Sequence, residues 1–238
     1  MQKKGFTLVE VLITIVIIGV VAAVTIPSLM IKKRNLGLET QFKTAYSLIL
    51  QAVTRMSVDN DNIAETYCGN NNFNTNTQYR FISDFSKYFQ VSQLCLTGNV
   101  RDCGYKQSFK EANGVTSFNV DGYNNGAFFV KNGMFVASSG CWWTGTQGVD
   151  FVVDTNGIKG PNRFGYDLFY FQINNQNVLL PSTDKYKFVI SYAQSTTCCN
   201  FTSTEKCNGM NNGTACSYFA IKDEYPHDTS KKYWESLH

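Results

Sequence analysis

The sequence predicts an α+β protein with three parts. A long N-terminal helix comes first, suited to a membrane in its first half and packed on an exported head in its second half. The head contains one antiparallel sheet and ends in a disulfide-rich C-terminal region. Three observations predict this arrangement: an uncharged run over residues 11–31, an apolar stripe that continues beyond it, and paired apolar runs with turn residues after residue 125.

The uncharged run is long enough to cross a bilayer. It holds 21 consecutive residues without an ionisable side chain, and a helix needs about 20 to span the hydrocarbon core. Glu10 immediately precedes the run. A carboxylate at such a place costs roughly 2.5–3.5 kcal/mol on insertion scales and by default marks a functional residue with a partner.

Two other interpretations of this segment remain open. An ordinary secretory signal also has a basic start and an apolar stretch, and residues 21–23 could serve as its small-residue cleavage site. Such signals have apolar stretches of about 7–15 residues, shorter than this run. A plain single-span anchor is the second alternative, with Glu10 reaching toward the membrane surface.

Beyond the run, apolar residues recur at helical spacing. They are Leu38, Phe42, Ala45, Ile49, Ala52 or Val53, and Met56. Spacings of three and four place them on one helix face, and the polar residues 59–62 provide a stop. We therefore expect one helix over residues 6–58, with its transmembrane part over 6–31.

Two helix-weakening residues lie inside the uncharged run. Gly19 is flexible, and Pro27 lacks the backbone donor of a regular helix. Together they predict either a hinge or a plain kink.

The sheet is predicted from apolar runs in the second half of the chain. Residues 127–130 and 134–137 flank Asn132-Gly133, and Asn-Gly between apolar runs is a strong hairpin signal. Residues 149–153, 168–173 and 178–180 are three further candidate strands. Before them, residues 67–125 are predicted to form a variable, Asn-rich segment with a short helix near 81–89.

The eight cysteines all lie beyond residue 67, which indicates that the head is exported and oxidised. They are Cys68, Cys95, Cys103, Cys141, Cys198, Cys199, Cys207 and Cys216. Eight bonded cysteines permit 105 pairings. Cys198 and Cys199 are adjacent and are therefore expected to bond to different partners. The competing use of clustered cysteines is zinc, but no Cys-x-x-Cys occurs and the two histidines, His227 and His238, lie in a polar tail.

One loop carries candidate metal ligands. Asp154, Asn156 and Asp167 lie in a stretch rich in Gly, Pro and Asn, and carboxylate and carbonyl oxygens are the ligands that calcium prefers. The full calcium-loop spacing is not met, and Lys159 brings a repelling charge. The alternative is a turn in which Asp and Asn accept backbone hydrogen bonds. Calcium is the only cofactor that the sequence suggests.

Composition argues against an enzyme and against a strong nucleic-acid binder. Removing Lys3 and Lys4 from a formal net charge of +3 leaves 19 basic against 18 acidic side chains, whereas electrostatic binding to nucleic acid needs clustered Lys and Arg. The histidines lie in the last twelve positions, which does not favour a hydrolytic triad. The phosphate-loop pattern does not occur.

The N-terminal string from Lys4 to Glu10, followed by the apolar helix, resembles the start of type IV prepilins and type II secretion pseudopilins. The resemblance implies a pilin-like fold and a leader, residues 1–5, that prepilin peptidase removes after Gly5. It implies that the new N-terminal Phe6 is methylated and that Glu10 pairs with the N-terminal amine of a neighbouring subunit. It also implies a disulfide within the C-terminal loop bounded by Cys198 and Cys216.

The resemblance favours a structural subunit of a pilus or pseudopilus, with residues 59–238 as the exported head. Its expected partners are other pilin subunits, the peptidase, an inner-membrane assembly platform and, before assembly, membrane lipid. The expected location is the bacterial inner membrane, then a periplasmic or extracellular filament. The alternative is a membrane-anchored minor pilin or binding module whose Cys-rich head contacts a surface, a glycan or DNA.

Overall fold

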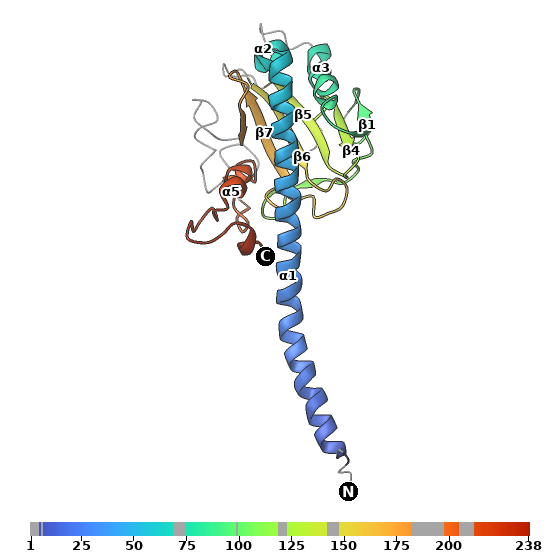
Figure 1. The fold of residues 1–238 in the computed structure, drawn as a ribbon, viewed down its shortest axis with the longest axis vertical. Helices are drawn as coiled ribbons and strands as arrows, with labels where there is room; N and C mark the ends of the chain where they lie inside the picture. The colour runs from blue at the N-terminus through green and yellow to red at the C-terminus, as the bar shows by residue number, and fades with distance from the viewer. Residues whose placement is uncertain are drawn as a thin grey trace.

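A computed structural model describes residues 5, 7–68, 75–98, 100–118, 123–141, 148–181, 198–204 and 212–238. The chain forms one long helix with a head around its C-terminal half, while the N-terminal half projects from the head alone (Figure 1). The helices are α1 (Leu8–Asp59), α2 (Ile63–Cys68), α3 (Thr75–Ser86), α5 (Cys216–Lys222) and the 3₁₀ turn η3 (Trp234–Ser236). The strands are β1 (Val91–Cys95), β2 (Phe109–Lys110), β3 (Ser117–Phe118), β4 (Ala127–Val130), β5 (Phe135–Cys141), β6 (Gly148–Asp154), β7 (Leu168–Asn174) and β8 (Leu179–Pro181).

Helix α1 confirms the expected element and its boundaries to within two residues. Its 52 residues correspond to a length of about 78 Å at 1.5 Å per residue. The helix ends at Asp59 and is capped by Asn60, whose backbone N–H donates to the Met56 carbonyl at 3.1 Å. The predicted apolar stripe, from Leu38 to Met56, is buried, and burial begins at Asn35. The helix is therefore divided at Asn35 into a free half and a packed half.

The main sheet is antiparallel, as predicted, and has the strand order β1-β4-β5-β6-β7-β8. The expected hairpin joins β4 to β5, where the Val130 N–H donates to the Met134 carbonyl at 2.8 Å. Gly133 occupies the left-handed region with φ 95°, a conformation that glycine adopts without steric cost. The three further predicted strands are β6, β7 and β8.

Both faces of this sheet are covered. Helix α1 packs on one face, where the Phe42 and Phe169 ring centroids lie 4.4 Å apart. The second face buries Tyr105, Phe109 and Phe135 in a separate cluster. Strand β6 is consequently buried along all seven residues, because its alternating side chains enter two different cores.

The segment between α1 and β4 is more ordered than its composition predicted. Helix α2 and strands β1, β2 and β3 were not expected, and the predicted short helix is α3, which begins and ends earlier than residues 81–89. Strand β1 has exposed polar positions at the sheet edge, so it lacks the apolar alternation by which a strand is recognised. The first turn of α3 consists of polar residues, so the sequence pattern does not mark where this helix begins. Farther along the helix, Phe81, Ile82 and Phe85 are buried.

The C-terminal tail, which the sequence analysis described as polar, packs against the core of the head. Tyr233, Trp234 and Leu237 are buried. The Trp234 ring lies 5.2 Å from the Phe42 ring of α1. The tail therefore closes the core on the side of the head from which the free half of α1 projects.

Three disulfides lie within the described residues: Cys68–Cys141, Cys95–Cys103 and Cys199–Cys216. The last confirms the bond expected between residues 198 and 216. Cys198 is also disulfide-bonded, so the adjacent cysteines have different partners, as predicted. The partner of Cys199 lies in the same C-terminal region rather than in a distant segment. Cys207 lies outside the described residues.

Loss of Cys68–Cys141 is expected to destabilise the head more than loss of Cys95–Cys103. The first closes a sequence separation of 73 residues and the second one of 8, and a longer loop restricts the unfolded chain more strongly. The difference is about 2 kcal/mol in the chain-entropy relation. Urea unfolding of the double Ser variants, C68S/C141S and C95S/C103S, measures it, and equal losses of stability would contradict the expectation.

A buried carboxyl on β6 predicts that the stability of the head depends on pH. Asp150 is 2 % exposed and accepts a hydrogen bond from the Gln172 side-chain amide at 2.9 Å. Burial raises the pKa of Asp150 to about 7. A carboxyl whose folded-state pKa lies above its unfolded value stabilises the fold at low pH. That contribution is lost as the pH rises through about 7.

We expect the wild-type head to gain about 2 kcal/mol from Asp150 between pH 7 and pH 5. Asp150→Asn keeps an acceptor for Gln172 but cannot ionise, so it should remove this part of the pH dependence. Urea unfolding at the two pH values measures the effect. Asp61→Asn changes an exposed carboxyl and is the matched control. An unchanged pH dependence in Asp150→Asn would show that Asp150 is not the responsible group.

Candidate functional site

The residues predicted for processing and assembly belong to the first ten positions of the chain, next to the free end of α1. Gly5 is exposed, while Phe6 lies outside the described residues. Thr7 is the N-cap of α1 and forms a capping box with Glu10. The Thr7 N–H and hydroxyl donate to Glu10 Oε2 at 2.8 and 2.7 Å, and the Glu10 N–H donates to the Thr7 hydroxyl at 3.3 Å.

The capping box gives Glu10 a structural role in addition to the expected pairing role. Within the described residues, both hydrogen bonds to the carboxylate end on Oε2. Oε1 can therefore accept from a further donor while the cap persists. Thr7 was not among the predicted site residues, although the spacing Thr-x-x-Glu is a known sequence signal of a capping box.

The N-terminal half of α1 offers an apolar surface that the head does not cover. None of its most apolar stretch is buried in the folded chain. The helix is long and apolar enough to cross a membrane. Large exposed apolar surfaces mark membrane or protein contacts, so this half can enter a bilayer or pack against other helices.

The two predicted hinge residues do not interrupt the helix. Helix α1 is continuous from Leu8 to Asp59 and includes Pro27. A side chain added at Gly19 would meet no atom within 4 Å, so internal packing does not require glycine there. Their role as a hinge remains a prediction.

The C-terminus fixes the head to α1 where the helix becomes buried. The Asn35 side-chain amide donates to the Leu237 carbonyl at 2.7 Å. The Tyr166 hydroxyl donates to the His238 carbonyl at 2.7 Å. The bond from Asn35 was not foreseen, because it joins residues about 200 positions apart with no local sequence signal. Together the two bonds attach the tail and the head to the helix directly above its exposed half.

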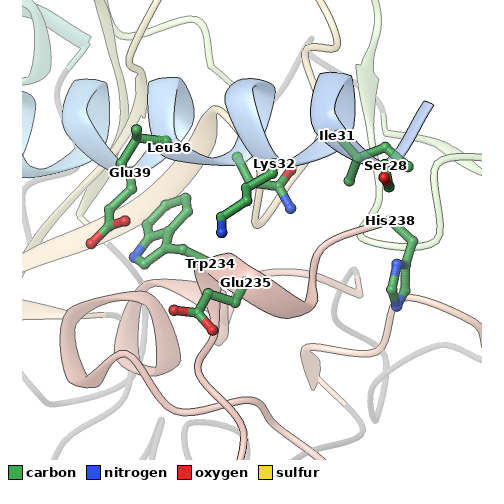
Figure 2. A pocket seen from close by; sticks show the side chains of 9 residues that line it. Ser28, Ile31, Lys32, Leu36, Glu39, Trp234, Glu235 and His238 are labelled. Carbon is green, nitrogen blue, oxygen red and sulfur yellow. The ribbon is translucent and has the colours of Figure 1, made fainter. Parts of the chain in front are cut away.

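A groove lies between α1 and this tail. It has a volume of about 540 Å³. Figure 2 shows Ser28, Lys32 and Glu39 on the α1 side and Trp234, Glu235 and His238 facing them. Charges of both signs line the groove, and two of its carboxylates pair with lysines, Glu39 with Lys43 and Glu235 with Lys232. The indole N–H of Trp234 is buried without a partner among the described residues.

The candidate calcium residues lie at the end of β6, which is Asp154, and in the connection to β7, which contains Asn156 and Asp167; the structure brings all three together. Asp154 and Asp167 are fully buried. Asp154 accepts from the Tyr105 hydroxyl at 2.5 Å and the Asn156 N–H at 3.0 Å. Asp167 accepts from the backbone N–H groups of residues 162 and 163 at 2.8 and 2.7 Å. Each carboxylate oxygen therefore already has a protein donor.

This arrangement does not fit a calcium site as it stands. Calcium takes six to eight oxygen ligands, and the part of the chain that the structure describes holds no group of three acidic, His or Cys residues suited to a metal. Burial raises the pKa of Asp167 to about 6 and, together with the charge of Asp167, raises that of Asp154 well above its usual value. Calcium binding would require these hydrogen bonds to be exchanged, and it remains a prediction.

The fold and the free helix define a class of protein: a head is carried on one long helix whose free half is apolar, and the first turn of that helix contains an acidic residue in a capping box. Residues 1–26 match the family model of the prokaryotic N-terminal methylation motif. The chain therefore carries the signal of type IV pilins and pseudopilins. This motif is typical of structural, non-enzymatic substrates of prepilin peptidase that are anchored in the membrane before assembly. No curated protein and no solved structure matches the chain.

Proposed function

We propose that the protein is a structural subunit of a type IV pilus or type II secretion pseudopilus. Prepilin peptidase cuts between Gly5 and Phe6, and the mature chain polymerises through α1. The single observation that carries the proposal is the exposed apolar half of α1, which bears the methylation motif at its start and the head at its end.

Assembly requires a contact that repeats without closing. A heterologous interface of this kind generates a helical filament. Packing of the exposed apolar halves of α1 supplies the contact area. Pairing of Glu10 Oε1 with the Phe6 amine of a neighbour supplies its register, because each subunit carries one acceptor and, after cleavage, one amine.

Before assembly, the same helix holds the subunit in the inner membrane with the head outside the cytoplasm. The partners at this stage are the peptidase, lipid and an assembly platform. Pro27 leaves one helical carbonyl without its usual donor. We propose that the helix loosens between Gly19 and Pro27 when the subunit leaves the bilayer for the filament.

Mass spectrometry of the mature N-terminus tests the processing step. The expected product begins with N-methylated Phe6. A chain that still begins at Met1, or one that begins near Val24 after a conventional signal cut, would contradict it.

A further inference from the structure

A second groove lies on α1 at the junction with the head, between the helix and the β6–β7 connection. It has a volume of about 600 Å³. Its walls include Met30, Lys33 and Arg34 from α1 and Asn156, Lys159 and Pro161 from the connection. Residues about 125 positions apart in sequence thus form one surface.

The groove is basic. Lys33, Arg34 and Lys159 line it, and no carboxylate does so among the residues that the structure describes. Arg34 donates to the Asn35 side chain and to the Leu237 carbonyl, while Lys33 and Lys159 are exposed. Neither lysine forms an ion pair within the described part of the chain. Three like charges gathered on one surface favour an anionic ligand.

The groove is continuous with the membrane-spanning surface. Its first wall residue, Met30, belongs to the uncharged run that ends at residue 31. When residues 11–31 span the hydrocarbon core, Lys33 and Arg34 lie within one turn of its end, at the level of the lipid headgroups. The β6–β7 connection, which contains Lys159, forms the opposite wall of the groove on the side of the head.

We propose that this groove binds the headgroup phosphate of an anionic phospholipid in the leaflet on the head side, before assembly. Arginine and lysine are the usual phosphate ligands, and basic pockets beside membrane helices bind anionic headgroups. A zwitterionic headgroup is disfavoured, because its own ammonium group would approach the same cations. The bound lipid holds the head against the bilayer and is released when the subunit enters a filament.

The inference uses the membrane placement in the proposed function but not filament formation. Lipid binding is measured on isolated subunits, so its failure and a failure to polymerise are separate results. The acidic side chain of a neighbouring subunit is the alternative occupant, and it would give no preference among lipids.

Native mass spectrometry of the full mature chain in detergent tests the proposal. The chain is mixed with phosphatidylglycerol or with phosphatidylcholine of the same acyl chains. We expect preferential retention of phosphatidylglycerol, decreasing with ionic strength. The double variant K33Q/K159Q should reduce that retention about thirtyfold.

The matched control is K106Q/K131Q, which removes two exposed lysines that do not line the groove. It should retain phosphatidylglycerol like the wild type. Disulfide mapping of both variants verifies that the head has folded. Equal retention of the two lipids by the wild type, or equal loss in the groove and control variants, would overturn the proposal.

Discussion

Replacing Glu10 with valine is expected to abolish filament growth while peptidase cleavage continues. The substitution removes an intramembrane charge, so the isolated subunit should be no less stable in the bilayer. It also removes the acceptor for the Phe6 amine of the next subunit. Mass spectrometry of the N-terminus and electron microscopy of sheared surface material measure cleavage and filaments separately.

The capping box requires a control, because Glu10→Val also removes the bonds between Glu10 and Thr7. Glu10→Gln keeps an oxygen acceptor for the Thr7 N–H but carries no charge. Thr7→Val removes the Thr7 hydroxyl and keeps the carboxylate. If pairing with an amine drives assembly, Glu10→Gln should fail and Thr7→Val should still form filaments. The reverse result would assign Glu10 a capping role only.

Replacing Gly5 with arginine is expected to leave the whole population unprocessed and unassembled. Gly5 is exposed and has no side chain, whereas arginine would place a long charged group directly beside the scissile bond. Without cleavage the Phe6 amine never forms, so Glu10 has no partner. Intact-mass measurement of membrane extracts should find a chain that begins at Met1.

Gln2→Arg is the matched control for that experiment. It adds the same side chain three residues earlier in the leader and should be processed normally. Normal maturation of the Gly5→Arg chain would show that the cut does not depend on Gly5 and would remove the main support for peptidase processing.

The features that the sequence predicted are those with local, periodic signals. The stripe from Leu38 to Met56 repeats at helical spacing, and Asn132-Gly133 lies between two apolar runs. Both signals depend on residues a few positions apart, so a single sequence reveals them. The methylation motif is similarly local, so the amino-acid sequence alone reveals the motif, while the roles of Gly5, Phe6 and Glu10 remain predictions.

The features that the sequence did not reveal depend on distant contacts. Strand β1 is ordered by pairing with β4, which is remote along the chain, although its own residues do not alternate between apolar and polar. The bond from Asn35 to Leu237 and the groove between Lys33 and Lys159 require the tertiary fold.

In the β6–β7 connection, the sequence pattern predicted the type of the candidate ligands but not whether their oxygens are free. Asp154 and Asp167 are recognisable in the sequence as oxygen ligands. Whether their oxygens are free depends on Tyr105 and on the path of the backbone, which no local pattern encodes. In the folded chain, protein donors already occupy those oxygens.

The central claim is that this chain polymerises through its N-terminal helix. Electron microscopy of sheared surface and periplasmic material, labelled with an antibody against the head, tests it most directly. The account predicts filaments labelled along their length in the wild type and none in Glu10→Val. Label that remains entirely in the membrane, with no labelled filament under conditions where the chain is processed, would contradict it and favour an anchored binding module.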